Sequence, residues 1–244
     1  EVRPFVVAIN RLLARVGQSM DSQRRFVADA AHELRSPMTA LALQADRLAA
    51  TELSPVSRER FEPLSRGIQR GRKLIDQLLS LAAAQSASER AQTTLSVHTV
   101  YRQILEDLLP LAESKQIDIG VESTQDVQVT LNELDLFTLV KNLVDNAIRY
   151  TPPGGRIDLS VALEADAVKL QIKDSGPGIP IEEQARVFDP FYRSLGTDEA
   201  GSGLGLSIVK AIADRTGARV QLGFTDVGEQ KGLCVTVWLH VDRI

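Results

Sequence analysis

The sequence predicts two successive folds, a helical hairpin followed by a two-layer α/β sandwich, so the fold class is α and then α+β. Residues 27–48 and 61–82 carry two apolar seams at helical spacing. The apolar residues of 157–172 instead alternate with polar or small ones, as strands do. Residues 85–92 are small and polar and have no period, which indicates a linker. The 244 residues, 43% of them hydrophobic, suffice for two modest domains with separate cores.

The composition argues against several classes of protein. The formal net charge of −4 gives no basic surface, so we expect no nucleic-acid partner. A lone cysteine, Cys234, cannot form an intramolecular disulfide and fits a reducing compartment. No apolar run approaches the length of a membrane span, and no signal peptide opens the chain. Because Glu1 is not an initiator, we expect a piece of a longer protein.

The first expected element is an amphipathic helix within residues 1–21. Four apolar residues recur there at helical spacing, with polar residues between them: Phe5, Ile9, Leu12 and Val16. So short a helix is marginal alone. We therefore expect it to act as a coiled-coil lever in a dimer, and a monomeric helix packed on the following bundle is the alternative.

The second expected element is a helix that carries a histidine on its outer side. Its apolar seam steps by four and three residues: Val27, Ala31, Leu34, Met38, Leu41, Ala45 and Leu48. Such a seam buries itself against partner helices, and His32 falls one residue off it, beside Glu33. Pro37 removes a backbone donor and clashes with the carbonyl of Glu33, so we expect a bend just after this pair. Imidazole titrates near neutral pH, so His32 is a candidate nucleophile, although a solvated surface histidine fits the same pattern.

A third helix is expected to begin at Ser54-Pro55, a good N-cap followed by proline at the first helical position. It repeats the four-three spacing: Phe61, Leu64, Ile68, Gly71, Ile75, Leu78 and Ala82. The two seams predict an antiparallel hairpin, and two copies should form a four-helix bundle because one hairpin has too little core. Gly67 and Gly71 each weaken this helix by about 1 kcal/mol relative to alanine, which predicts a close approach of helix backbones.

The remaining chain mixes helices and strands. We expect helices at 97–114, 132–150 and 204–215, and strands at 118–121, 127–131, 157–163, 168–172, 220–224 and 233–241. The strands of 157–163 and 168–172 should form a hairpin. Helices combined with neighbouring strand hairpins indicate a two-layer α/β sandwich.

Three polar residues lie four and three apart on the helix of 132–150, at the margin of its apolar side: Asn142, Asn146 and Arg149. Carboxamide oxygens suit a magnesium ion that keeps waters and bridges phosphates, and a guanidinium neutralises phosphate charge. A solvated helix face would look the same, so this strip alone is not specific.

Three further segments make a nucleotide site the better interpretation. Asp174 ends a strand, where it can accept a hydrogen bond from an exocyclic amine such as that of adenine, and the glycines after it let backbone approach a ligand. Residues 201–206 open a helix whose amides can hold phosphates. Between them, residues 187–194 run into an aperiodic segment, 195–200, which we expect to be a mobile lid. Four elements in this order are a specific signal.

Together these motifs resemble the cytoplasmic transmitter of a sensor histidine kinase from a two-component system. The likeness rests on an H box (26–41), an N box (142–150), two glycine boxes (174–178 and 201–206), an F box (188–193) and an opening like the last helix of a HAMP module (2–13). It implies a signalling helix at 1–21, a dimerisation and phosphoacceptor hairpin at 22–86, a linker at 87–94 and a Bergerat-type ATP-binding domain at 95–244.

The resemblance implies that ATP phosphorylates His32 and that the phosphoryl group then passes to an aspartate in the receiver domain of a response regulator. Glu33 would orient the imidazole. Ser36 stands where threonine or asparagine commonly orients water for dephosphorylation of the regulator. The resemblance further implies a homodimer, and a sensor region before this chain would anchor it in the bacterial inner membrane.

In the implied ATP site, Asn146 is the principal Mg²⁺ ligand and Asn142 assists. Arg149, which stands where many family members have lysine, contacts phosphate. The other implied binding residues are Tyr150 and Asp174 at the base, Gly176 and Gly178 after Asp174, Phe191 and Arg193 in the F box, and Gly201, Gly203, Leu204, Gly205 and Leu206 at the phosphates. Arg193 is the residue expected to reach the γ-phosphate.

Two rivals remain. An ATPase of the same GHKL fold, of the gyrase or chaperone kind, would use a glutamate base where this chain has Asn142, and an amide cannot accept the proton of water. A non-catalytic dimeric adaptor would keep the fold without turnover. The intact set of His32, Asn146, Asp174 and both glycine boxes argues against it.

Overall fold

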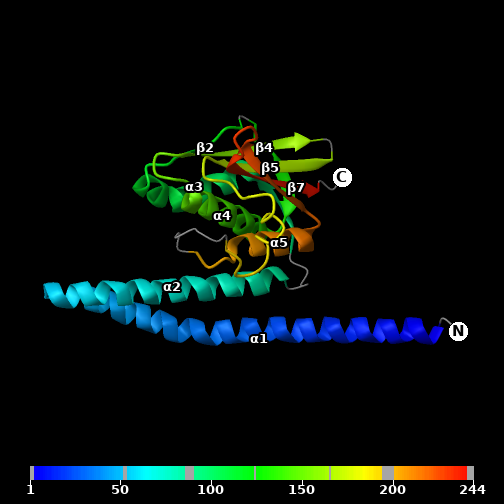
Figure 1. The fold of residues 1–244 in the computed structure, drawn as a ribbon, viewed down its shortest axis with the longest axis horizontal. Coiled ribbons are helices and arrows are strands. Elements are labelled where there is room, and N and C mark those ends of the chain that lie inside the picture. The colour runs from blue at the N-terminus through cyan, green and yellow to red at the C-terminus, as the bar shows by residue number, and fades with distance from the viewer. Residues whose placement is uncertain are drawn as a thin grey trace. The chain divides into compact units, whose positions relative to one another are not determined.

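The computed structural model describes residues 3–51, 54–85, 91–123, 125–164, 166–193 and 201–240 (Figure 1). The chain forms two compact units, residues 1–85 and 86–244. The first is helical and the second is a mixed sheet covered by helices, which confirms the predicted fold class. Among the described residues, no helix is both long and apolar enough to cross a membrane.

The helical unit is the predicted hairpin of α1 (Arg3–Ala49) and α2 (Pro55–Gln85). The Oγ of Ser54 accepts a bond from the amide of Ser57 at 3.2 Å, so α2 starts with the predicted serine cap and proline. An ion pair of 3.1 Å joins Arg35 of α1 to Asp76 of α2. Since residues near the end of α1 face the start of α2, the two helices run antiparallel.

Helix α1 continues from the predicted signalling helix into the His32 helix without a break, and it contains Pro37. Figure 1 shows α1 changing direction in its second half, as a proline inside a helix predicts. The prediction of a backbone contact at the two α2 glycines is wrong. A Cβ on Gly71 would instead meet the methyl of Met38 at 2.7 Å, and a Cβ on Gly67 would meet nothing within 4 Å.

The apolar seam of α1 divides into two kinds of residue. Its two alanines, Ala31 and Ala45, are buried within the chain, as is the neighbouring Ala42. The leucines of the seam stay exposed at every seventh position: Leu34, Leu41 and Leu48. The hairpin therefore closes on alanines, and a leucine stripe remains on its surface.

The second unit is built on a five-stranded sheet in the order β2-β4-β5-β7-β6. Its strands are β2 (Asp118–Val121), β4 (Arg156–Glu164), β5 (Ala167–Asp174), β6 (Arg219–Asp226) and β7 (Lys231–His240). The β2–β4 pair is parallel and the others are antiparallel, so β4 and β5 form the predicted hairpin. A separate two-stranded ladder pairs β1 (Thr93–Ser96), which was not predicted, with β3 (Gln128–Leu131).

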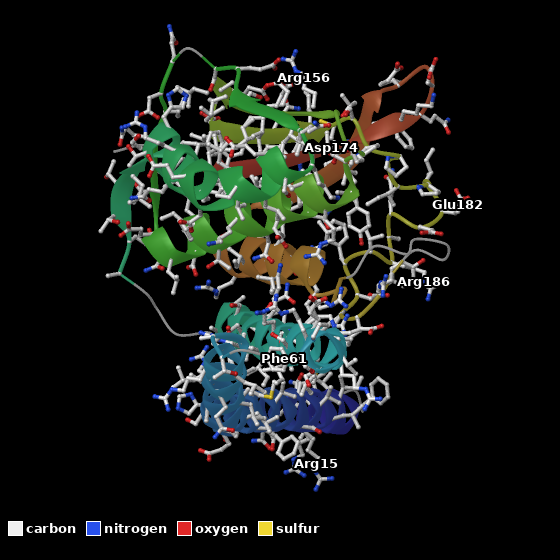
Figure 2. The ribbon with its side chains drawn as sticks, turned by 90° about the vertical axis from the view of Figure 1, so that its left-hand side faces the viewer. Arg15, Phe61, Arg156, Asp174, Glu182 and Arg186 are labelled. Atoms are coloured by element: carbon white, nitrogen blue, oxygen red, sulfur yellow. The ribbon has the colours of Figure 1, made fainter. Side chains whose placement is uncertain are left out.

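Three helices complete the sandwich: α3 (Val97–Ser114), α4 (Glu133–Tyr150) and α5 (Gly205–Thr216). Figures 1 and 2 show them together on one face of the sheet. The central helix α4 is buried along one side, and alternate residues of β4, β5 and β7 fill the space between the layers. This core fixes both ends of α4 relative to the ends of β5 and β7.

A buried ion pair joins the first turn of α4 to the last turn of α5. The Oδ1 of Asp135 lies 2.6 Å from an Nη of Arg215, and these side chains are 3% and 16% exposed. The same first turn is capped by Asn132, whose Oδ1 accepts from the amide of Asp135 at 3.3 Å. Cap and ion pair together hold the start of α4.

We expect Asp135→Asn to lower the free energy of unfolding by roughly 3 kcal/mol, because it removes the carboxylate that neutralises a buried guanidinium. The matched control is Asp107→Asn, which breaks the exposed 2.7 Å pair between Asp107 of α3 and Lys141 of α4. An exposed pair contributes about 0–1 kcal/mol. Urea unfolding of the full chain measures both, and equal effects would contradict the assignment of the Asp135 pair.

Candidate functional site

His32 lies on the exposed surface of α1, directly after the buried Ala31. Glu33 and Ser36 are exposed as well, on the turn that follows. The hairpin therefore presents an imidazole, a carboxylate and a hydroxyl to solvent within little more than one turn, beside Pro37. The outward direction predicted for His32 is confirmed.

Asp174 continues the row of β5 residues that faces the helices, after Val168, Leu170 and Ile172. It is therefore buried between the layers (Figure 2), with 5% of its surface exposed. Its Oδ1 accepts bonds from the amides of Gly176 at 2.8 Å and Leu233 at 3.0 Å. Burial raises the pKa of Asp174 above its usual value near 3.8, and the two amides act in the opposite direction.

The glycines after Asp174 are required by close approaches. A Cβ on Gly176 would lie 2.9 Å from the carbonyl oxygen of Tyr150, at the end of α4. Gly178 has a φ of +78°, and a Cβ there would lie 3.0 Å from the carbonyl oxygen of Gly232. The first glycine box thus packs the end of β5 against the end of α4 and the start of β7.

The predicted strip on α4 is half-buried at the margin of the core. The Nδ2 of Asn142 donates to the carbonyl of Thr138 at 2.8 Å, so Oδ1 is the ligand atom that this side chain can offer. That Oδ1 lies 3.6 Å from where a Cβ on Gly205 would stand. Asn146 follows one turn later, also half-buried.

Arg149 ends the strip. Its Nη2 donates to Oδ2 of Asp145 at 2.9 Å, and its Nη1 lies 2.9 Å from where a Cβ on Gly201 would stand. Residues 142 and 149 of α4 therefore both border the second glycine box. The structure brings these two predicted parts of the site together.

The second glycine box folds back on the F box. Gly203 has a φ of +72°, and its carbonyl accepts from the amide of Phe191 at 3.0 Å. Phe191 is itself exposed at a φ of +66°. Leu204, the N-cap of α5, is apolar, so its side chain cannot accept from the first-turn amides, which suits an anion.

Leu204 and Leu206 are buried and anchor this turn, and Arg193 is exposed. The predicted lid at 195–200 lies outside the described residues. Tyr150 is half-buried at the last turn of α4.

The sequence reasoning missed two residues that fix the end of the site. The Nζ of Lys115 donates to the carbonyls of Ile148 and Arg149 at 3.2 and 2.6 Å, closing the C-terminal end of α4. Gly232, at a φ of +69°, lies against the carbonyl of Asp174. Nothing in the sequence around Lys115 indicates that it reaches α4. Gly232, by contrast, could have been noticed as a glycine at the start of a predicted strand.

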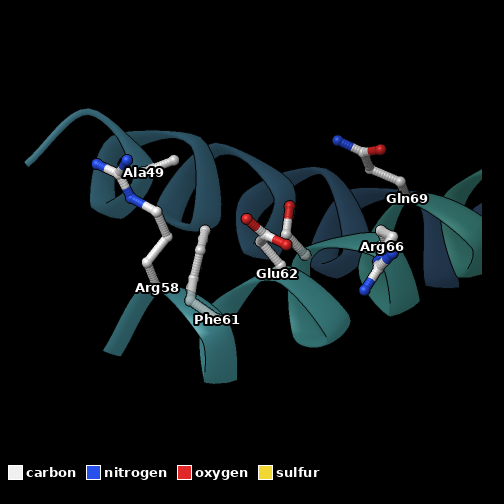
Figure 3. A pocket seen from close by; sticks show the side chains of 7 residues that line it. Ala49, Arg58, Phe61, Glu62, Arg66 and Gln69 are labelled. Atoms are coloured by element: carbon white, nitrogen blue, oxygen red, sulfur yellow. The ribbon is translucent and has the colours of Figure 1, made fainter. Parts of the chain in front are cut away.

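The described residues contain no group of three or more His, Cys, Asp or Glu side chains arranged to hold a metal ion. A cation at this site would therefore depend on amide oxygens, water and phosphate, which is the ligand set that Mg²⁺ accepts. The residues present fit that ion. A separate depression of about 380 Å³ lies at the turn of the helical hairpin (Figure 3), and none of the predicted site residues lines it.

Comparison with family models assigns both units. Residues 22–87 match the His Kinase A (phospho-acceptor) domain. Residues 131–243 match the histidine kinase-, DNA gyrase B- and HSP90-like ATPase domain.

Curated relatives are sensor proteins. The chain is 38% identical over 231 residues to the sensor protein QseC of Escherichia coli K12, covering 93% of this chain and 51% of QseC. It is 35% identical over 234 residues to the swarming motility regulation sensor protein RssA of Serratia marcescens, covering 93% and 50%. The chain thus spans about half the length of the curated relatives it matches.

Solved structures share the fold. Full-length ShkA in complex with AMPPNP superposes with a TM-score of 0.72 at 25% identity, covering 89% of this chain and 46% of ShkA. The mycobacterial sensor histidine kinase MprB superposes with a TM-score of 0.55 at 28% identity, covering 63% and 99%.

We expect Asp174→Asn to raise the melting temperature at pH 7 relative to the original chain, by about 2–4 °C for each kcal/mol gained. A raised pKa means that the folded state holds the proton longer, so the stability of the original chain falls as pH rises from about 4 through the folded pKa. The difference between the two melting temperatures should therefore be larger at pH 7 than at pH 4.

The matched control for this pH dependence is Asp226→Asn. Asp226 also accepts two backbone amides, from Gly228 and Glu229, but it is exposed. It should show no gain that grows with pH. A gain for Asp174→Asn that shrinks toward pH 7 would contradict the burial argument.

Proposed function

Because the chain belongs to the sensor histidine kinases of two-component systems, we propose that it uses ATP to phosphorylate His32 and then passes the phosphoryl group to an aspartate of a response regulator. The observation that carries the proposal is the pairing of two parts in one chain. An exposed histidine lies in the phosphoacceptor hairpin, and the α4, β5 and α5 ends of the second unit converge on one site.

The base of ATP is assigned to Asp174. Both amides that bond this carboxylate do so at Oδ1. Oδ2 is then the oxygen for the exocyclic amine of adenine, which is a donor that a buried carboxylate can select. Tyr150 flanks the base from the last turn of α4.

The phosphates are assigned to the space between the α4 strip and the second glycine box. Asn146, with Asn142, would hold Mg²⁺ through amide oxygens, and Mg²⁺ when bound neutralises phosphate charge. Arg149 and the first-turn amides of α5 add positive charge from the protein. Phosphoryl transfer needs mainly positioning and charge neutralisation, and this arrangement supplies both.

At the acceptor, the unprotonated nitrogen of His32 attacks the γ-phosphorus, a phosphorus–nitrogen bond forms, and the bond to the ADP oxygen breaks. Glu33 accepts a hydrogen bond from the other ring nitrogen, which orients the imidazole and stabilises the positive charge that develops. In the transfer to the regulator, a carboxylate oxygen of the aspartate attacks the phosphorus, an oxygen–phosphorus bond forms, and the phosphorus–nitrogen bond to His32 breaks. His32 is exposed, so both ATP and the aspartate of the regulator can reach it.

Ser36 carries the second activity that we propose, dephosphorylation of the regulator. Its hydroxyl lies four residues after His32 on the same exposed helix surface, where it can orient a water toward the phosphoaspartate. This activity rests on one hydroxyl. The autokinase activity rests on the whole ATP site.

The proposed assembly is a homodimer. The exposed Leu34, Leu41 and Leu48 repeat every seven residues, which is the spacing of a helix packed along a partner helix. Since the curated relatives are about twice as long as the match, we propose that a sensor region precedes this chain in the membrane.

We expect the purified chain with γ-labelled ATP and Mg²⁺ to acquire an acid-labile label, and His32→Gln to abolish it. The control is His240→Gln, which changes an exposed histidine at the end of β7 and should leave labelling intact. A label that persists in His32→Gln would overturn the assignment of His32. Steady release of ADP without label would favour the ATPase rival.

We expect Asn146→Asp to weaken ATP binding by about 30-fold or more. The substitution replaces a neutral amide at a half-buried position with a carboxylate, whose negative charge repels the phosphates. The control on the same helix is Asn132→Asp, an equal change of charge at the N-cap, where aspartate caps as well as asparagine. Binding of a fluorescent ATP analogue measures both. Equal affinity in the two variants would contradict the phosphate site.

A further inference from the structure

We propose that Asp145 is a positioning residue that holds the guanidinium of Arg149 against the second glycine box. The proposal rests on the proposed function, because it concerns the phosphate end of the same ATP site. Asp145 belongs to none of the roles assigned above. It lies on the half-buried strip of α4, between Asn142 and Arg149 in the sequence.

The first observation is the ion pair itself. The Nη2 of Arg149 donates to Oδ2 of Asp145 at 2.9 Å, and the two side chains are only 17% and 20% exposed. A charge-assisted bond at a partly desolvated position is stronger than the same bond in water. It also restricts the rotamers of a long side chain before any ligand binds.

The second observation is where this pair puts the other end of the guanidinium. Nη1 lies 2.9 Å from where a Cβ on Gly201 would stand, so any larger residue at that position would have to displace the guanidinium from this place. Gly201 is the first residue of the box that opens α5. The carboxylate of Asp145 thus acts on one side of the guanidinium, and the glycine box receives the other.

The chain contains a pair that shows what an ordinary exposed contact looks like. Lys210 and Asp214 of α5 form an i,i+4 pair at 2.6 Å, with side chains 50% and 60% exposed. Like the Asp145–Arg149 pair, it joins an acidic and a basic residue four positions apart on one helix. Both side chains of the Lys210–Asp214 pair are at least half exposed, whereas the Asp145 pair is mostly buried and borders the second glycine box.

The geometry favours positioning over competition with phosphate. A guanidinium has five N–H donors in a rigid fork, so a bond from Nη2 to Asp145 and a contact from the Nη1 side with phosphate are compatible. Holding the fork in advance lowers the entropy that ATP binding would otherwise lose. If Asp145 instead competed for Arg149, its removal would tighten ATP binding.

The test compares the full chain with Asp145→Asn and the control Asp214→Asn. We expect Asp145→Asn to raise both the Kd of a fluorescent ATP analogue and the KM for labelling by about tenfold, since a bond to a charged group is lost. The labelling rate at saturating ATP should change less than twofold. Asp214→Asn should match the original chain, and thermal unfolding checks that each variant is folded.

A double-mutant cycle separates positioning from a direct role. In an Arg149→Met background, Asp145→Asn should cause no further change in Kd, because Asp145 acts through Arg149. A tenfold effect that persists there, together with a shifted Mg²⁺ dependence, would make Asp145 a metal ligand and overturn the proposal. So would tighter binding by Asp145→Asn in the original background.

Different results would contradict the proposed kinase function and the positioning role of Asp145. If the original chain binds the nucleotide analogue but acquires no label on His32, the proposed kinase function is wrong. If it binds and is labelled, and Asp145→Asn behaves identically to it, only the positioning role of Asp145 is wrong.

Discussion

The two hydrogen bonds to the buried Oδ1 of Asp174 are the interaction on which the geometry of the site depends. This oxygen bonds the amides of Gly176, two residues later, and Leu233, at the start of β7. One oxygen thereby joins segments that are far apart in the chain. Burying this carboxylate is costly, as its raised pKa indicates, so a fold selected for stability alone would place there an amide, whose oxygen could still accept both bonds. A charge kept at such a cost is best explained by a ligand that needs an acceptor.

The sequence predicts those parts of the site that depend on patterns within a single helix, strand or turn. The buried side and the polar strip of α4 both lie within one helix of 18 residues, where the helical period separates them. The alternation of β5 puts Asp174 on the same face of the sheet as Ile172. The glycine boxes are visible because a positive φ or a close backbone approach demands glycine, as at Gly178 and Gly203. Each of these signals is contained within a few turns or strands.

The parts that escape prediction are contacts between distant segments. Lys115 reaches the end of α4 from the turn after α3, and nothing near it in sequence marks that role. Strand β1 has only four residues, too few to show an alternation. It forms because its backbone pairs with β3 in an antiparallel ladder. Gly71 looked like a backbone contact, yet what approaches it is the flexible end of Met38. Periodicity gives the face of a residue but not its neighbour.

The helical unit shows how a histidine can lie next to a buried core residue and still be exposed. The alanines of the α1 seam are buried in the hairpin, whereas its leucines, at every seventh residue, are exposed. The alanines of α1 bury little apolar area against Ile75 and Leu81 of α2, so the proposed dimer would gain stability by covering that leucine stripe. In the proposed dimer, where a second copy covers this stripe, His32, one position away from the seam, would stay open to solvent. The proposed dimer and the exposed position of His32 would thus both follow from the same spacing.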